Sequence, residues 1–377
     1  MKIGILTLPF NNNYGGYLQA YALMTVLKQM GHHVELIYRR QNRRPLKWQI
    51  QYFIKNTIKI LLGRKHVSLI PNQEKELRAK GKLMMTFVDN HIIPRTKPLY
   101  SSSALKQYAN NRYDAIIVGS DQVWRPDYVP NIEDFFLTFL SDKTKRIAYA
   151  ASFGTDTPSY TNIEKEECGK GIELFDLITV REKSAIQIIN DFEWICRKGP
   201  IQVLDPAFLL PKNHYVSLII SKQSNMKGKI FCYILDSNGY IKNIVSKVCC
   251  MLRKESSDFL DEENRKKGDC LFPSIELWLS YFRDADFVVT DSFHGTVFSI
   301  IFNKPFIVYL NEERGISRFS SLLSMLGLNG RIIHSANDIE KSSILSIDWD
   351  NVNTILRDER DKSLNCLIEI LQDNNIR

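Results

Sequence analysis

The chain has no uninterrupted run of about 18 apolar residues, the length that a membrane-spanning helix requires. Its first eight residues, MKIGILTL, lack the long apolar core and the small-residue cleavage site of a signal peptide, and they are typical of a buried strand. We therefore expect a cytoplasmic protein.

Metal-ligand spacings are absent as well. The seven cysteines form no CxxC pair and have no metal-ligand spacing with histidine. We expect reduced, mostly buried thiols and no metal site, because a free cysteine behaves as a small hydrophobic residue.

The composition is that of a folded globular protein, with 44% hydrophobic and 24% charged residues. A chain of 377 residues exceeds what one hydrophobic core usually serves, so we expect two domains with a cleft between them.

The net charge of +8 is concentrated in residues 39–66, which hold nine Lys or Arg residues and no acid. Within this stretch, apolar residues recur on one helical face, bordered by lysines. The apolar positions are Leu46, Ile50, Phe53, Ile54, Ile58, Leu61 and Leu62, and the lysines are Lys47, Lys55 and Lys59. Two interpretations remain open: residues 46–62 contact anionic lipid peripherally on the inner face of the membrane, or they form an ordinary helix that covers the sheet.

Apolar and helical runs alternate along the chain. A strand at 2–8, a helix at about 16–30 and a strand at 33–38 form one βαβ unit. Further strands are predicted at 115–118, 147–149, 177–180, 201–204, 229–235, 286–290 and 305–309. This alternation predicts an α/β fold with parallel sheets covered on both faces. We expect domains at 1–210 and 211–348, followed by a C-terminal helix at 349–377 that packs back on the body.

The most informative local motif is DSFHGT, residues 291–296, which joins a predicted strand to a helix. The N–H groups at a helix start bind phosphate or carboxylate, and Ser292 is placed to cap the helix and to donate to an anion. His294 can exchange a proton near neutral pH. In the alternative interpretation Ser292 only caps the helix and His294 bonds a loop carbonyl.

Two loops of the N-terminal half carry polar groups at strand ends. Residues 12–19 place Gly15 and Gly16 where backbone can approach a ligand, although a plain strand-to-helix turn explains them as well. Residues 119–126 contain planar polar side chains and Trp124, which suit the binding of a sugar. A capped loop whose tryptophan belongs to the core explains the same sequence.

Three arginines are candidates for binding an anionic substrate. Arg181 follows the strand 177–180, and Arg314 and Arg318 lie in a later loop. A guanidinium binds carboxylate or phosphate at two points, but each of these arginines is equally compatible with a surface ion pair.

Together these segments resemble the polysaccharide pyruvyl transferase family, over most of the chain from residue 1 to about 333. The matching segments are 12–19, 119–124, 149–154, 180–182, 205–206, 290–295, 318–323 and 326–328. The resemblance implies two Rossmann-like domains facing across a cleft, similar to the GT-B glycosyltransferases.

The resemblance also implies an activity. The enolpyruvyl group of phosphoenolpyruvate would move onto a sugar of a surface polysaccharide or its lipid-linked precursor as a ketal, with release of phosphate and without a cofactor. His294 and Arg181 would be catalytic. Donor-binding positions would be Ser292, Gly295, Thr296, Arg314 and Arg318. Acceptor-binding positions would be Asn13, Tyr14, Gly15, Gly16, Gln19, Ser120, Asp121, Gln122 and Trp124.

Two rival functions stay open. One is a glycosyltransferase of the same architecture that uses a nucleotide-sugar donor at the helix of His294. The other is a non-catalytic glycan-assembly protein that docks through its basic helix. We do not expect nucleic-acid binding, because the basic stretch contains no recognised reading module.

Overall fold

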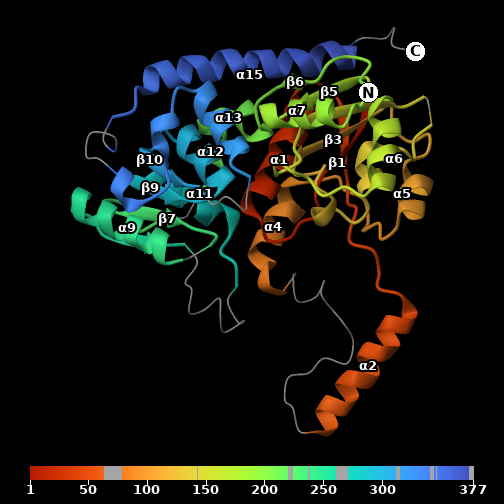
Figure 1. Cartoon of the computed structure of the whole chain (residues 1–377), viewed down its shortest axis with the longest axis horizontal. Coiled ribbons are helices and arrows are strands. Elements are labelled where there is room, and N and C mark those ends of the chain that lie inside the picture. Colours follow the sequence, from red (N-terminus) through yellow and green to blue (C-terminus); the bar gives the residue numbers. More distant parts are fainter. Residues whose placement is uncertain are drawn as a thin grey trace.

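The computed structural model describes residues 1–62, 79–141, 143–219, 224–236, 238–259, 271–310, 315–339, 344 and 346–372. Arg314, expected to bind the donor, lies outside the described residues, as does the end of the basic stretch beyond residue 62. Figure 1 shows two α/β halves side by side, each built on its own sheet.

The first sheet has six parallel strands in the order β2-β1-β3-β4-β5-β6. Its strands are β1 (Lys2–Leu6), β2 (His33–Ile37), β3 (Ala115–Asp121), β4 (Lys145–Ala151), β5 (Leu177–Val180) and β6 (Ile201–Gln202). Every residue of β3 and β5 is buried, as expected for strands with helices on both faces. The helices of this part of the chain are α1 (Tyr14–Gln29), α2 (Leu46–Leu61), which stands away from the sheet, α4 (Lys82–His91), α5 (Ser102–Ala109), α6 (Asn162–Ile172) and α7 (Lys183–Asp191).

The second sheet has five strands in the order β11-β10-β9-β7-β8, again with parallel pairings. Its strands are β7 (Ile230–Tyr233), β8 (Ser256–Asp258), β9 (Phe287–Thr290), β10 (Phe306–Tyr309) and β11 (Ile332–Ile333). Its helices are α8 (Lys212–Ser217), α9 (Gly239–Leu252), α11 (Ile275–Asp284), α12 (Phe293–Ile301) and α13 (Ser317–Met325). The predicted parallel α/β organisation is confirmed, and β8 and β11, which are short, were not foreseen.

Short 3-10 turns connect several of these elements. They are η1 (Pro126–Tyr128), η2 (Ile132–Phe136), η3 (Pro206–Leu209), η5 (Asn329–Arg331) and η6 (Ala336–Asp338). The turn η3 lies between the two sheets in the chain and begins at the N-cap residue Asp205.

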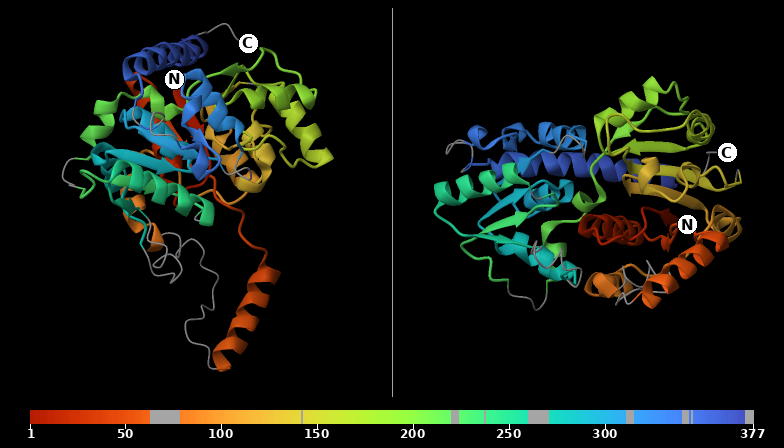
Figure 2. Two further views of the ribbon diagram at one scale, coloured as in Figure 1. Left: turned by 60° about the vertical axis from the view of Figure 1, so that its left-hand side comes forward. Right: turned by 60° about the horizontal axis from the view of Figure 1, so that its bottom comes forward.

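The last helix, α15 (Trp349–Gln372), returns to the first half of the chain. The hydroxyl of Ser363 accepts a hydrogen bond from the Leu204 amide at 3.0 Å, and the carbonyl of Ile370 accepts one from Lys145 at 2.9 Å. Figures 1 and 2 show this helix lying along both halves.

The two halves are joined by an aromatic contact. The ring of Tyr14, at the first turn of α1, stacks on Trp278 of α11 with 5.4 Å between ring centroids. Its hydroxyl donates to the carbonyl of Pro273 at 2.8 Å. The two halves therefore share one continuous apolar core at this point.

A second contact between the halves needs a glycine. Gly315 has φ of +75°, and a Cβ there would come within 2.4 Å of the carbonyl oxygen of Gly154. Next to it, the hydroxyls of Ser184 and Ser317 are 2.9 Å apart. The start of α7 thus lies against the start of α13.

The helix α2 does not cover either sheet. Figure 1 shows it standing away from both halves, at the end of the extended segment that follows β2. Asn56 is its one buried residue. The interpretation of residues 46–62 as an ordinary sheet-covering helix is therefore wrong.

We expect Tyr14→Ala to lower the free energy of unfolding by about 3–5 kcal/mol, because the change removes a buried ring from the junction. Urea denaturation would measure it. Tyr240, whose side chain is 71% exposed, supplies the control, and Tyr240→Ala should change stability by less than about 0.5 kcal/mol. Equal midpoints for the two variants would contradict a structural role for Tyr14.

Candidate functional site

The site begins at the start of α12. The backbone amide of Gly295 donates to the hydroxyl of Ser292 at 3.3 Å, which caps the helix. The hydroxyl of Thr296 donates to the Ser292 carbonyl at 3.1 Å. At Gly295 a Cβ would meet the Thr290 hydroxyl at 2.2 Å. These three predicted donor-binding residues therefore shape the turn that presents His294.

His294 lies between the two halves. Its Nε2 is 3.5 Å from Oδ2 of Asp205, and its side chain is only 7% exposed. The other edge of the ring lies on Gly15 of α1, where a Cβ would come within 1.9 Å of the imidazole Cγ. The same Cβ would come within 2.0 Å of Nδ1, so Nε2 faces Asp205 and the Nδ1 side of the ring packs on Gly15.

Asp205 is the carboxylate that links His294 to Arg181. Its Oδ2 accepts from Nη1 of Arg181 at 2.9 Å, and its Oδ1 accepts from the Ala207 amide at 3.0 Å. Burial by itself raises the pKa of Asp205, but His294, Arg181 and the amide together bring that pKa below its usual range. Asp205 is therefore ionised at neutral pH.

Arg181 is buried among three carboxylates. Besides Asp205 it faces Asp121, with Nη2 3.6 Å from Oδ1, and Glu182, with Nε 3.7 Å from Oε2. Its guanidinium carbon lies 4.3 Å from the ring centre of Phe293. Its Nε and Nη2 make no hydrogen bond within the described residues. Buried polar atoms are normally paired, so this arrangement favours a polar ligand beside the guanidinium.

Arg318 of α13 approaches the same group from the second half. Its guanidinium carbon is 5.7 Å from the ring centre of Phe293, the ring that Arg181 also contacts. Burial, together with the charge of Arg181, lowers the pKa of Arg318 to about 10. Burial raises the pKa of Glu182 against the opposing effect of Arg181. The cluster thus concentrates charge of both signs at the junction.

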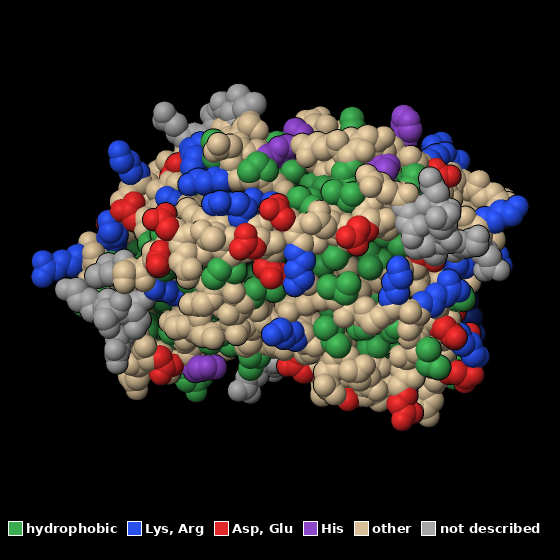
Figure 3. Space-filling model, turned by 90° about the horizontal axis from the view of Figure 1, so that it is seen from above, with side chains coloured by type: hydrophobic (Ala, Val, Ile, Leu, Met, Phe, Trp, Pro, Cys, Tyr) green, Lys and Arg blue, Asp and Glu red, His purple; other side chains and the backbone are tan. Residues whose placement is uncertain are grey.

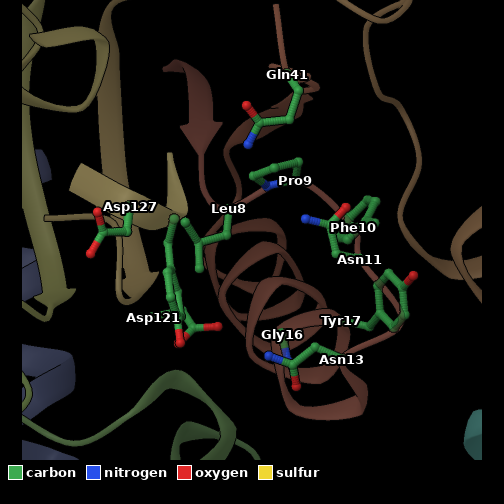
Figure 4. A pocket seen from close by; sticks show the side chains of 11 residues that line it. Leu8, Pro9, Phe10, Asn11, Asn13, Gly16, Tyr17, Gln41, Asp121 and Asp127 are labelled. Carbon is green, nitrogen blue, oxygen red and sulfur yellow. The ribbon is translucent and has the colours of Figure 1, made fainter. Parts of the chain in front are cut away.

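A pocket of about 330 Å³ opens on the first half next to this cluster. It is lined by Leu8, Pro9, Phe10, Asn11, Asn13, Gly16, Tyr17, Gln41, Asp121, Asp127 and Tyr128. Figure 4 shows Asn13 and Gly16 at the start of α1, with Asp121 on one side and Tyr17 on the other. Asp121 belongs to both the pocket and the cluster, and its buried Oδ2 has no hydrogen-bond partner within the described residues.

The structure divides the predicted acceptor-binding residues into two sets. Asn13, Gly16 and Asp121 line the pocket. Gly15 supports His294 instead, and Gln122 packs on Gly154, where a Cβ would come within 1.9 Å of its Oε1. These last two residues act on the site through their neighbours.

At four further positions predicted to bind the acceptor, the side chains are held inside the fold. Tyr14 joins the halves, as described above. The amide of Gln19 bonds the Thr7 hydroxyl at 3.0 Å, and the hydroxyl of Ser120 donates to the Ala150 carbonyl at 2.7 Å. Trp124 is fully buried and donates to the Phe135 carbonyl at 3.2 Å. The interpretation of Trp124 as a core residue is the one that fits.

Sequence reasoning missed several site residues. In the sequence Asp205 belongs to the matching segment 205–206 and Glu182 to the segment 180–182, and neither carries a local pattern that indicates a role in the site. Of the residues that line the pocket, only Asn13, Gly16 and Asp121 were predicted, and Tyr17, Gln41 and Tyr128 are among those that were not. The position of Tyr17, one helical turn beyond Asn13, could have indicated that its ring lies in the pocket. Gln41 belongs to no motif, so nothing in the sequence indicates its place in the pocket.

Two surveys of the described residues bear on metals and membranes. No group of three or more His, Cys, Asp or Glu side chains within the described ranges could hold a metal ion. Within the same ranges, every helix is too short or too polar to cross a lipid bilayer.

With this geometry established, the chain can be compared with known proteins. Residues 13–313 match the sequence profile of the family described as polysaccharide pyruvyl transferase. The chain belongs to the polysaccharide pyruvyl transferase family. A comparison with curated protein sequences finds no match.

Solved structures similar to this pyruvyl transferase family member confirm the predicted GT-B-like fold. UDP-GlcNAc 2-epimerase from Neisseria meningitidis, bound to UDP-GlcNAc, aligns with a TM-score of 0.52 at 10% identity, covering 99% of this chain and 100% of that one. The epimerase from Rickettsia bellii gives 0.54 at 9% identity, covering 98% and 96%. Glycyrrhiza uralensis UGT73P12, complexed with glycyrrhetinic acid 3-O-monoglucuronide, gives 0.51 at 11%, covering 99% and 96%.

The contact between Gly15 and His294 leads to a prediction. Gly15→Ala should destabilise this pyruvyl transferase family member by about 1–3 kcal/mol, because the new methyl group must displace the imidazole. Thermal denaturation and the imidazole NMR signals of His294 would report the change. In Gly239→Ala the added methyl group meets nothing within 4 Å, so both readouts should stay as in the wild type. An unshifted His294 signal in Gly15→Ala would contradict the packing described.

The lowered pKa of Asp205 leads to a second prediction. Asp205→Asn should cost about 3 kcal/mol near neutral pH, because a buried partner of Arg181 is lost. A carboxyl group with a lowered folded-state pKa stabilises fully above its unfolded pKa of about 3.9 and loses that effect below it. The stability difference between wild type and variant should therefore shrink as the pH falls from about 7 to about 3 in urea titrations.

Asp89→Asn is the matched control, because Asp89 is 58% exposed in its ion pair with Arg95. Its effect should stay below about 1 kcal/mol at every pH. A pH-independent penalty for Asp205→Asn would show that the carboxylate charge does not stabilise the fold.

Proposed function

We propose that this protein transfers the enolpyruvyl group of phosphoenolpyruvate to a sugar of a surface polysaccharide or its lipid-linked precursor, forming a ketal and releasing phosphate. One observation carries the proposal. Asp121, in the wall of the pocket, is linked through Arg181 and Asp205 to the imidazole of His294. His294 does not line the pocket itself, so a group able to exchange a proton lies behind the wall of a pocket of sugar size and is connected to it through two charged side chains.

The pocket supports the choice of acceptor. Its polar lining consists of the amides of Asn11, Asn13 and Gln41 and the carboxylates of Asp121 and Asp127, without Lys or Arg. Amide and carboxylate oxygens accept hydrogen bonds from hydroxyl groups, and aromatic rings pack on the apolar face of a sugar. We infer an acceptor sugar without negative charge. A volume of about 330 Å³ suits one monosaccharide unit.

The donor side is supported by the cations at the junction. Arg181 and Arg318 both lie near the ring of Phe293 at the start of α12. The helix start and the guanidinium groups both favour a carboxylate or a phosphate. The charge of Arg181 is already balanced by Asp205. We therefore assign the phosphate of phosphoenolpyruvate chiefly to groups of the second half of the chain, and we assign to Arg181 a further contact with the donor inside the site.

The chemistry requires one proton for the methylene carbon of phosphoenolpyruvate and the removal of two protons from acceptor hydroxyls. Protonation of the methylene carbon leaves a cationic centre at the adjacent carbon, which the first hydroxyl attacks as it loses its proton. Phosphate then leaves, and the second hydroxyl closes the ketal as it loses its own. Of the two protons that the acceptor hydroxyls lose, one replaces the proton that the enzyme delivered to the methylene carbon, and the other stays on the released phosphate.

We assign the delivery and recovery of the proton to the imidazole of His294. Oδ2 of Asp205 lies 3.5 Å from Nε2, and the other edge of the ring packs on Gly15, so both neighbours limit the orientation of the imidazole. The buried Oδ2 of Asp121 is placed to accept a hydrogen bond from the attacking hydroxyl. The arginines stabilise the charge that develops on phosphate as it departs.

The test is an incubation with phosphoenolpyruvate and candidate lipid-linked or nitrophenyl glycosides. We expect phosphate release together with a glycoside mass increased by a pyruvyl ketal. His294→Ala should lower kcat by about 100- to 10,000-fold, the usual contribution of general acid–base catalysis. His334→Ala is the control, because His334 is exposed and distant in sequence from the cluster.

Ligand-induced stabilisation separates the rival functions. Phosphoenolpyruvate should raise Tm, and nucleotide sugars should not, because only a ligand of the native state stabilises it. A rise with a nucleotide sugar and none with phosphoenolpyruvate would replace the proposal by a glycosyltransferase. A non-catalytic assembly protein would release no phosphate and would tolerate His294→Ala.

A further inference from the structure

The helix α2 exposes a row of large apolar side chains. Leu46, Ile54 and Leu61 are 72%, 53% and 80% exposed. Residues 46–62 contain eight of the sixteen exposed large hydrophobic side chains found in the described part of the chain. Exposed apolar residues are usually scattered singly, so a concentration of this kind marks a contact surface.

These side chains share one face of the helix, which we call the α2 apolar face. Its members are Leu46, Ile50, Phe53, Ile54, Ile58 and Leu61, which follow the spacing of three and four that an α-helix requires. The opposite side carries Trp48, Tyr52 and Asn56, which are less exposed. The rings of Trp48 and Tyr52 stack with 5.1 Å between centroids. The α2 apolar face therefore points outward.

The charge of the segment selects the partner. Residues 43–59 contain five Lys or Arg and no Asp or Glu. On the face that carries α15, in contrast, acidic and basic side chains are intermixed (Figure 3). A second copy of α2 would bring like charges together, whereas an anionic lipid surface complements both the charge and the apolar face.

The position of α2 relative to the pocket supports the same partner. Gln41 lines the pocket, and the helix begins at Leu46. A chain of five residues spans at most about 17 Å, so the start of the helix stays near the pocket mouth. A surface bound by α2 would hold a substrate attached to that surface within reach of the pocket.

We propose that α2 binds the surface of an anionic membrane, with the α2 apolar face inserted at the boundary of headgroups and acyl chains and the lysines and arginines on lipid phosphates. Such helices lie in the interface plane and do not cross the bilayer. The idea that α2 brings the enzyme to a lipid-linked acceptor rests on the proposed function. The binding of α2 to an anionic membrane does not depend on that function.

The experiment is co-sedimentation of the full chain with phosphatidylcholine vesicles, with and without phosphatidylserine. The protein should pellet with the mixed vesicles, bind pure phosphatidylcholine far more weakly, and dissociate as salt is raised. A triple variant, Lys47→Glu, Lys55→Glu and Lys59→Glu, should bind at least about 100-fold more weakly.

Two further variants complete the design. Ile50→Ser with Ile54→Ser and Ile58→Ser should also abolish pelleting, because it removes the α2 apolar face. Lys106→Glu with Lys198→Glu and Lys227→Glu makes the same change in net charge at exposed positions elsewhere and should bind nearly as the wild type does.

Wild-type protein that stays in the supernatant, or equal binding by both lysine variants, would overturn the inference. A dimer in solution that the Ile50→Ser set dissociates would assign the face to a second copy instead. Phosphate release from phosphoenolpyruvate with a water-soluble glycoside separates the two proposals. Vesicle binding without that activity would reject only the proposed function, and activity without vesicle binding would reject only the membrane contact.

Discussion

The buried carboxylate of Asp205 is the group on which the rest of the site depends. It comes from the turn between the two sheets, accepts a hydrogen bond from Arg181 of the first half, and faces His294 of the second. A charge at this depth is stable only while it is paired, so the two halves are held in one relative position by electrostatics as well as by packing. The same pairing orients the imidazole.

Packing at the junction follows from the same arrangement. The starts of α1 and α12 approach so closely that only glycine fits at position 15. The stack of Tyr14 on Trp278 then fills the adjoining space, and Gly315 allows the return loop to reach Gly154. Gly15 and Tyr14, which the sequence places in a predicted ligand-binding loop, thus serve mainly to bring the starts of α1 and α12 together.

Much of this could be predicted from sequence, because strand-to-helix segments carry strong local signals. The parallel α/β fold, the family and the position of His294 at a helix start all follow from local patterns and motif order. The directions of side chains do not. Trp124 and Gln19 stand in segments that resemble binding loops in sequence, yet Gln19 lies in α1 and tertiary packing turns both side chains inward. Asp205 acquires its role from partners remote in sequence. Whether α2 covers a sheet depends on the path of the chain, which periodicity cannot determine.

Asp205 and His294 come from different halves of the chain, and this has an evolutionary consequence. Neither half alone contains both Asp205 and His294, so a gene fragment that encodes one sheet would carry only part of the cluster. Duplication or exchange of single halves, which is open to proteins whose domains work independently, would separate these partners here. Substitutions at the junction can be accepted only in compatible pairs, and we expect the two halves to have diversified together.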